Sequence, residues 1–398
     1  MSIISQNIVS LSESQSLAMA QRVATLRERG VNVINMTLGE PDFDTPLHIK
    51  EAAIKAVQDN FSHYGPVKGL LSLREAISHK LATENQLHYT PDEIIVSVGA
   101  KQAICNTILT LINPNDEVII PTPSWVSYSE MVKIAGGKNV FVKTSSTTDY
   151  KLTAEQLKAT ITEKTKLLIL CSPNNPTGSV YSHDELASLV AVIQEHPNLY
   201  IISDEVYEKI NYLGAHASLA SFPEIAERVC LVNGVSKAYA MTGYRIGWMA
   251  CHNKDIIKAY TILQGQYLTC ACIVAQKAAE AAYIGDQTCV EMMCNEYKKR
   301  LNIITTALQD TPSLKLVEPQ GAFYIFPDVS LYYGKSYNGK QICNSHDMIN
   351  YLLEEAHVAC VAGDAFGDDH CIRLSYALDE KKIIQAMIQI KEALKKLQ

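Results

Sequence analysis

Residues 229–247 read VCLVNGVSKAYAMTGYRIG. The apolar run at the start of this segment has the character of a buried strand, and it ends at the turn Asn233-Gly234. Lys237 follows that turn, beside Ser236 and eight residues before Arg245. Burial and a neighbouring cation both lower the pKa of a lysine, which frees its amine to attack carbonyl groups. The segment therefore predicts a reactive lysine at the end of a buried strand; the alternative is an ordinary solvated lysine on the surface.

Other apolar runs of the same kind lie upstream and also end in turn residues. They are residues 93–98 before Gly99, residues 118–120 before Pro121, residues 167–171 before Ser172, and residues 199–202 before Ser203. Unbroken apolar runs are typical of strands buried on both faces, and their alternation with helical patterns indicates a mostly parallel central sheet flanked by helices. The sequence therefore predicts an α/β fold. Ligands of such sheets bind beyond the carboxyl ends of the strands, which places the expected site at that edge.

The pattern changes near residue 285. Beyond it, helical patterns at residues 296–308 and 383–397 are combined with strand-like runs at residues 322–326 and 371–375. This mixture predicts a smaller α+β domain. We therefore expect three parts, which are an N-terminal segment (1–45) that joins the small domain, a large cofactor-binding domain (46–285) and a small C-terminal domain (286–398).

The composition argues against several other classes of protein. Hydrophobic residues make up 47% and charged residues 19% of the 398 residues, and the net charge of −7 lacks the basic excess of a nucleic-acid binder. No apolar stretch has membrane-spanning length, and the polar N-terminus lacks the profile of a signal peptide, so we expect a cytoplasmic protein without a membrane partner. The eleven cysteines include no CxxC pair, which predicts reduced thiols and no metal site.

Residues near the expected strand ends match the physical demands of one cofactor, pyridoxal 5′-phosphate. Its ring nitrogen needs a buried carboxylate to stay protonated, and Asp204 follows the run at residues 199–202. Its phenolic oxygen needs hydrogen-bond donors, for which Tyr207 and Asn175 are candidates. Its phosphate needs an anion site, and its ring needs an aromatic cover. The candidates for the phosphate site are Gly99, Ala100 and Lys101 at a helix start, together with Ser236 and Arg245. The candidate for the aromatic cover is Trp125.

Each of these residues also has an ordinary structural interpretation. Asp204 is a favoured helix N-cap, and Asn175 is a turn former before Pro176. Tyr207 and Trp125 are residues that commonly pack in a core, and a glycine before a helix is commonly only a turn. The cofactor hypothesis depends on their joint placement at strand ends together with Lys237, whose amine would form the covalent imine.

Six motifs resemble the signature runs of the class I/II pyridoxal-phosphate aminotransferases of fold type I. They are SPNNPTG at 172–178, DEVY at 204–207, SKAYAMTGYRIG at 236–247, GEPDF at 39–43, YGPVKG at 64–69 and RLSY at 373–376. The resemblance extends from about Ser14 to the C-terminus. Within the family, the chain is most similar to the bacterial aspartate aminotransferases of subgroup Ib.

The resemblance implies a role for individual residues. Lys237 would form the imine and move a proton at the substrate's Cα, and Arg373 would clamp the α-carboxylate. Asn175 and the backbone of Gly39 would contact the amino acid, and Trp125 would stack on the ring. Tyr64 would reach the phosphate in the neighbouring subunit, which implies a homodimer with shared active sites. Taken alone, Arg373 is also interpretable as a surface charge at a strand edge, and Tyr64 as a loop aromatic.

The same resemblance bears on the substrate. In subgroup Ib a serine near the N-terminus and the lysine of a Gly-x-Lys-Gln run bind the distal carboxylate, and Ser14 and Lys101 stand at the matching positions. This implies transfer of the amino group of L-aspartate to 2-oxoglutarate by a ping-pong mechanism. Lys101 is equally interpretable as a solvated lysine in the first turn of a helix. The alternatives are an aminotransferase for aromatic amino acids or alanine, or a pyridoxal-phosphate-dependent carbon–sulfur lyase.

Three positions depart from the family pattern. Tyr244 replaces a tryptophan that is common before the arginine, and both are large aromatic residues. Ser12 stands where members that use prephenate carry a basic residue, which argues against activity on prephenate. Residues 266–270 depart from the Gln-Ser-x-Thr-Ser pattern of the dimer-facing pocket wall, which leaves the side-chain specificity open.

Overall fold

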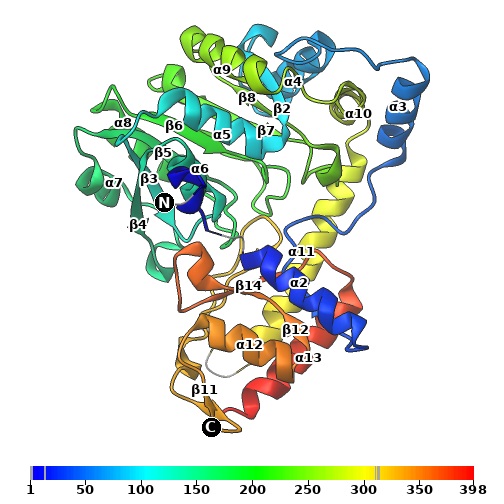
Figure 1. Ribbon diagram of the computed structural model, residues 1–398, viewed down its shortest axis with the longest axis vertical. Coiled ribbons are helices and arrows are strands. Elements are labelled where there is room, and N and C mark those ends of the chain that lie inside the picture. The colour runs from blue at the N-terminus through cyan, green and yellow to red at the C-terminus, as the bar shows by residue number, and fades with distance from the viewer. Residues whose placement is uncertain (1–2, 13–14, 310, 312–313) are drawn as a thin grey trace.

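The computed structural model describes residues 3–12, 15–309, 311 and 314–398 (Figure 1). Its largest sheet has seven strands, which lie in the order β2-β8-β7-β6-β5-β3-β4. Their bounds are β2 (Ile94–Val98), β8 (Ile246–Ala250), β7 (Val229–Gly234), β6 (Tyr200–Asp204), β5 (Thr165–Cys171), β3 (Glu117–Thr122) and β4 (Lys138–Lys143). Five neighbouring strands, from β7 to β4, pair in parallel. The predicted α/β fold with a mostly parallel central sheet is therefore confirmed.

Helices cover both faces of this sheet, which explains why its strands are unbroken apolar runs. One face packs against α5 (Gly99–Leu111), α6 (Ser127–Ile134) and α9 (Lys254–Tyr267). The other face packs against α4 (Leu71–Glu84), α8 (His183–Gln194) and α10 (Ile273–Ile284). Two further helices of this region are α3 (Leu47–Gln58), which packs on α10, and α7 (Ala154–Thr160).

Two strands of the sheet lie outside the predicted runs. β8 runs antiparallel to both of its neighbours, so the sheet is mixed at this end. Gly247 in β8 approaches the start of α5 so closely that a Cβ atom there would lie 2.2 Å from the backbone nitrogen of Ala100. β4 forms the opposite edge, and most of its residues are at least partly exposed, so it lacks the apolar character that revealed the inner strands.

A second hydrophobic core forms below the large sheet, around the long helix α11 (Figure 1). Its helices are α2 (Gln15–Glu28), α11 (Thr288–Gln309), α12 (Ser345–Glu355) and α13 (Glu380–Lys395). Its strands are the antiparallel β13 (Val361–Ala362), β14 (Ile372–Ser375) and β9 (Tyr324–Ile325), and the parallel pair β1 (Ile34–Asn35) and β12 (Val358–Ala359). Met19, Val23 and Met36 from the N-terminal part pack into this core with residues of the C-terminal part.

Three further short elements belong to the described fold, in addition to several 3-10 turns. They are α1 (Gln6–Val9), which contacts α6, and the antiparallel pair β10 (Ser336–Tyr337) and β11 (Lys340–Gln341). Among the described residues, no helix is long and apolar enough to span a membrane. No group of three or more potential metal ligands gathers anywhere in the described part of the chain.

Candidate active site

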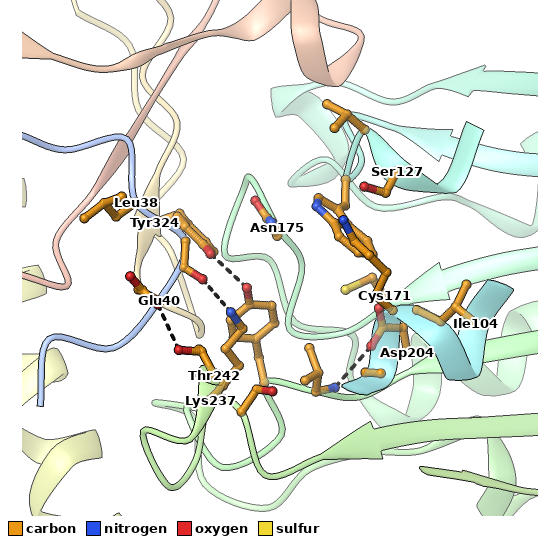
Figure 2. A pocket seen from close by; sticks show the side chains of 18 of the residues that line it. Leu38, Glu40, Ile104, Ser127, Cys171, Asn175, Asp204, Lys237, Thr242 and Tyr324 are labelled. Carbon is orange, nitrogen blue, oxygen red and sulfur yellow. Dashed lines mark hydrogen bonds between the residues drawn. The ribbon is translucent and has the colours of Figure 1, made fainter. Parts of the chain in front are cut away.

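A cleft of about 630 Å³ lies at the carboxyl ends of β5, β6 and β7 (Figure 2). Loops that follow these strands meet there with the start of α5, the loop at residues 37–40 and β14. Most of the residues proposed from the sequence line this one cleft. They are Gly39, Ala100, Lys101, Trp125, Asn175, Asp204, Tyr207, Ser236, Lys237, Arg245 and Arg373.

Lys237 lies in the turn after β7, and its side chain enters the cleft. Its ammonium donates a hydrogen bond to the carbonyl oxygen of Gly39, and it lies 5.8 Å from the ring centroid of Tyr207. Burial, together with the cations Arg373 and Arg245, lowers the pKa of Lys237 to about 8, against the opposing effects of Glu40 and Asp204. The amine is therefore neutral far more often than that of a surface lysine, as a nucleophile requires.

Asp204 is the last residue of β6 and is only 3% exposed. Its carboxylate accepts a hydrogen bond of 2.6 Å from the phenol of Tyr128 and one of 3.3 Å from the backbone N–H of Val206. Burial raises the pKa of Asp204 to about 6, although these two hydrogen bonds oppose the rise. These two hydrogen bonds offset only part of the cost of burying the negative charge of Asp204. A cationic group in the cleft would stabilise that charge, and a protonated ring nitrogen is such a group.

The start of α5 and Arg245 form a cradle that suits an anion. Gly99 has a φ of +78°, and a Cβ atom there would lie 2.5 Å from Nη2 of Arg245, so the close approach of guanidinium and backbone requires glycine. Arg245 itself has a left-handed φ of 57° and donates a 2.8 Å hydrogen bond to the carbonyl of Thr242. Free N–H groups at a helix start, a guanidinium and the hydroxyl of Ser236 are the donors that a phosphate prefers.

Arg373 in β14 is buried, with 3% of its surface exposed. It donates hydrogen bonds of 3.0 Å to the side-chain oxygen of Asn175 and of 2.7 Å to the carbonyl of Thr37. Its guanidinium carbon lies 4.6 Å from the ring centroid of Tyr324. Its Nε has no hydrogen-bond partner, and no carboxylate of the described residues pairs with its guanidinium. A buried guanidinium without a counterion is suited to bind a carboxylate from outside the protein.

Aromatic residues form the walls of the cleft. The hydroxyl groups of Tyr207 and Tyr324 lie 2.8 Å apart, and the rings of Trp125 and Tyr128 meet edge to face at 5.3 Å. The ammonium of Lys101 lies 4.9 Å from the ring centroid of Trp125. Burial lowers the pKa of Lys101, and Arg245 lowers it further. Lys101 therefore presents a partly desolvated cation next to the aromatic wall.

Three predicted site residues lie outside the lining of the cleft. Gly99 lies against the guanidinium of Arg245 at the start of α5. Tyr64 lies in a separate surface depression with Phe61 and Cys270, and it is 90% exposed. Ser14 is outside the described residues. The proposed contact of Tyr64 with a neighbouring subunit and the proposed role of Ser14 stay predictions.

Tyr128 and Tyr324 are two of the lining residues that the sequence analysis did not propose. Tyr128 contacts Asp204 from α6, and Tyr324 contacts both Tyr207 and Arg373 from β9. Tyr128 lies three residues after Trp125, which is about one helical turn, and that spacing is the one signal that could have drawn attention to it. Tyr324 lies in a run that was interpreted only as a strand.

The donor set of the cleft fits pyridoxal 5′-phosphate. Four cationic side chains and two anionic ones line it among the described residues, so it has an excess of positive charge suited to a phosphate and a carboxylate. Arg373, whose buried Nε is unpaired, and Arg245, which packs against Gly99, both line the same cleft as the reactive amine of Lys237. The buried carboxylate of Asp204 is the kind of acid that the ring nitrogen of this cofactor needs.

Comparisons with known proteins agree with this geometry. The profile of the family "Aminotransferase class I and II" matches residues 31–390. A Petunia hybrida protein described as a bifunctional aspartate aminotransferase and glutamate/aspartate-prephenate aminotransferase is 45% identical, over 98% of this chain and 82% of its own length. A probable aspartate/prephenate aminotransferase of Rickettsia bellii is 43% identical, over 99% of both chains. The crystal structure of an aspartate aminotransferase from Rhizobium meliloti superposes with a TM-score of 0.97 at 38% identity, and all of both chains is covered.

Proposed function

We propose that this chain, which belongs to the class I and II aminotransferases, transfers the amino group of L-aspartate to 2-oxoglutarate. The reaction of this class is ping-pong, so the amino donor leaves as its 2-oxo acid before the acceptor binds. When bound, pyridoxal 5′-phosphate supplies an electron sink for the pair released at Cα and carries the amino group between the two half-reactions. The observation that best supports the proposal is the joint placement of Asp204, Lys237 and Arg373 in one cleft.

The residues that hold the cofactor are those whose contacts suit each of its parts. Asp204 keeps the ring nitrogen protonated, because its buried carboxylate is stabilised by a cationic neighbour. Gly99, Ala100, Ser236 and Arg245 donate hydrogen bonds to the phosphate. Tyr207 and Asn175 act as donors to the phenolic oxygen, and Trp125 stacks on the ring.

The remaining residues orient the amino acid and move its proton. Arg373 binds the α-carboxylate through a fork of donors, and its contact with Asn175 fixes the plane of that fork. The backbone of Gly39 lies beside the amine of Lys237 and limits where Cα can sit. Lys237 then accepts the proton from Cα, because its lowered pKa makes the amine a base near neutral pH.

Substrate selection depends on the second carboxylate of aspartate. Lys101 lines the same cleft as Arg373, and its partly desolvated ammonium gives a charged partner that alanine and phenylalanine cannot use. We propose Ser14 as the second donor to this carboxylate. Prephenate is named for the Petunia and Rickettsia relatives. We retain the expectation, from Ser12, that this chain does not favour it.

The assembly, the domain division and the location are proposals as well. We propose a homodimer in which Tyr64 completes the neighbouring site, supported by the exposure of Tyr64 and of the apolar Leu47, Ile54 and Val57 on α3. We keep the division into residues 1–45, 46–285 and 286–398, supported by the separate cores around the large sheet and around α11. All eleven cysteines are unpaired, which supports a reducing compartment such as the cytoplasm.

A spectral titration of the purified holoenzyme tests the proposed reaction. Addition of L-aspartate should convert the absorbance of the bound aldehyde form to that of the amine form, and 2-oxoglutarate should restore it. L-Alanine and L-phenylalanine at equal concentration should give a slower or smaller conversion. If one of these two amino acids converted the enzyme faster than L-aspartate, the dicarboxylate assignment would be wrong, while the aminotransferase assignment would stand.

A further inference from the structure

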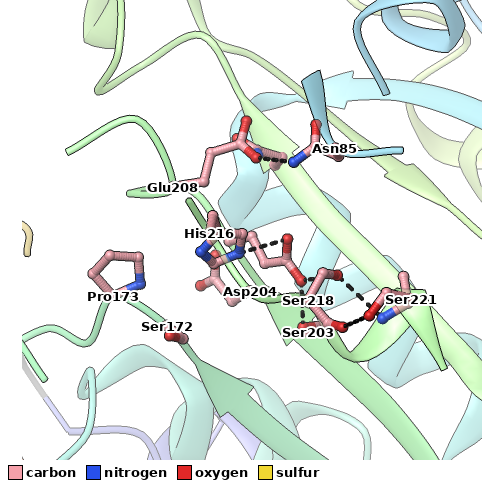
Figure 3. A network of polar contacts seen from close by, with 12 residues as sticks. Asn85, Ser172, Pro173, Ser203, Asp204, Glu208, His216, Ser218 and Ser221 are labelled. Atoms are coloured by element: carbon pink, nitrogen blue, oxygen red, sulfur yellow. Dashed lines mark hydrogen bonds and ion pairs between the residues drawn. The ribbon is translucent and has the colours of Figure 1, made fainter. Parts of the chain in front are cut away.

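A buried network of charges lies immediately next to Asp204 and is not part of the cleft (Figure 3). Its centre is Glu205, the next residue along the chain, which is 1% exposed. Oε1 of Glu205 accepts hydrogen bonds of 2.8 Å from the hydroxyl of Ser203 and 2.6 Å from that of Ser218. Oε2 lies 2.9 Å from Nε2 of His216. Burial of a carboxylate to this extent costs free energy, and hydrogen-bonding and charged partners of this kind offset that cost.

His216 is the positive partner of this carboxylate. Its side chain is 6% exposed, and burial alone would lower its pKa. The carboxylates of Glu205 and Glu208 nevertheless raise the pKa of His216 above its ordinary value, so the imidazole keeps its positive charge to a higher pH than an ordinary histidine does. Its Nδ1 is buried without a hydrogen-bond partner, so Glu205 is the group that holds the ring in place.

A second ion pair completes the network. Glu208 pairs with Lys80, and its other oxygen accepts a 2.8 Å hydrogen bond from Asn85. Burial raises the pKa of Glu208, but the charges of Lys80 and His216 and the hydrogen bonds from Lys80 and Asn85 together lower it to about 2. Glu84 lies 3.9 Å from Lys80 at the outer side. With His216 protonated, the two buried carboxylates Glu205 and Glu208 are balanced by two cations.

The groups that face this network from other elements are weak acids. Tyr89 lies close enough to Glu205 for the carboxylate to raise the pKa of the phenol, and Glu205 acts in the same direction on the thiol of Cys171. The thiols Cys230 and Cys251 are buried near Tyr89. Phenols and thiols carry no positive charge in either protonation state, so these groups do not replace the charge of His216. Glu205 also acts on Asp204, and its negative charge raises the pKa of that carboxyl.

We propose that Glu205 and His216 act as a charge-balanced positioning pair that sets how tightly Asp204 holds a proton. The inference rests on the proposed role of Asp204 as the partner of the cofactor's ring nitrogen. With His216 charged, the field of Glu205 at Asp204 is largely cancelled, and the carboxylate stays available as an anion. Without that charge, an unpaired carboxylate would stand beside Asp204 and favour its protonated form.

The His216→Gln variant tests the charge and retains a side chain that can donate to Glu205. We expect the pKa of Asp204 to rise by about one unit in this variant. The double variant Glu205→Gln/His216→Gln removes both charges and keeps an amide pair, so we expect the pKa of Asp204 to return to its wild-type value. If the network had only a structural role, the double variant would shift the pKa of Asp204 more than the single variant does, because it disturbs more of the network.

The measurement is a pH titration of the full-length apoprotein labelled with ¹³C at the aspartate side-chain carboxyl groups. The Asp204 signal is assigned by its loss in the Asp204→Asn variant. His370→Gln is a matched control, because His370 pairs with Asp368 at 3.1 Å in the small domain and is 69% exposed. We expect no shift of the Asp204 titration in that control. Thermal unfolding of each variant shows that it is folded.

Two results would overturn the inference. One is an unchanged Asp204 titration in folded His216→Gln protein, and the other is a double variant that remains as strongly shifted as the single one. Neither result would affect the proposed reaction, which the spectral titration of the wild-type holoenzyme tests separately. If instead the wild-type chain bound no pyridoxal 5′-phosphate, the proposed role of Asp204 would fail even with the expected shifts.

Discussion

The phenol of Tyr128 donates a hydrogen bond of 2.6 Å to Oδ2 of Asp204, and both residues are at most 3% exposed. Burial raises the pKa of Tyr128 well above its ordinary value, so the phenol keeps its proton and always acts as the donor. The bond therefore stabilises the ionised form of Asp204 and works against the rise that burial causes in its pKa.

Replacement of Tyr128 by Phe should raise the pKa of Asp204 by about one unit, because a hydrogen bond to an ionised group is lost. The affinity of the apoprotein for pyridoxal 5′-phosphate, measured as a function of pH, reports this change. We expect the pH at which binding strengthens to move upward. An unchanged pH profile would show that Tyr128 does not influence Asp204.

Asp204 should cost the apoprotein stability above pH 6. Its pKa is about 6 in the fold and near 4 in the unfolded chain, so the folded state binds more protons between these values. The contribution of Asp204 to the free energy of unfolding is therefore fully present below pH 4, and it is lost as the pH rises through 6. At pH 7.5 the Asp204→Asn apoprotein should be more stable than wild type by about 2 kcal/mol, while its cofactor affinity falls. The free energy of unfolding of both proteins, measured with denaturant at pH 7.5 and at pH 4.5, tests this prediction. An equal difference between the two proteins at both pH values would contradict it.

Several elements of this architecture could be predicted from the sequence, because burial on both faces leaves a continuous apolar run. The runs that begin at Leu167, Leu199 and Val229 predicted β5, β6 and β7, and the polar residues after them line the cleft. β8 was hidden because it begins at Ile246, within the motif that ends at Gly247, and β4 because it is an edge strand.

Other parts of the site depend on contacts that no local pattern records. Tyr128 meets Asp204 across 76 residues of chain, and His216 meets Glu205 through a loop. Such pairs form only when the whole sheet is assembled, so the sequence gives their residue types but not their proximity. A lysine or an arginine next to a strand end is also common, and only the cleft shows that Lys101 and Arg373 face a shared space.

Lys101→Ala should separate the substrates. We expect kcat/KM for L-aspartate to fall about 10- to 100-fold, since one charged contact to the distal carboxylate is lost. Turnover of L-alanine and L-phenylalanine should change little. Lys164→Ala is a suitable control, because Lys164 is exposed in the turn before β5, at the opposite edge of the sheet. Equal losses for all three amino acids in Lys101→Ala would remove the role of Lys101 in specificity.

Arg373→Lys should impair all amino acids alike. The α-carboxylate is common to every substrate, and a lysine keeps the charge but lacks the planar fork that contacts Asn175 and Thr37. We expect kcat/KM to fall about 100-fold for L-aspartate and L-alanine. A loss confined to L-aspartate would instead assign Arg373 to the distal carboxylate.

Reduction of the holoenzyme with borohydride, followed by proteolysis and mass spectrometry, tests most directly whether Lys237 carries the cofactor. We expect a phosphopyridoxyl group on the peptide that contains Lys237, and no such label in the Lys237→Arg variant. A label on a different lysine of the wild-type protein, or none on any peptide, would contradict it.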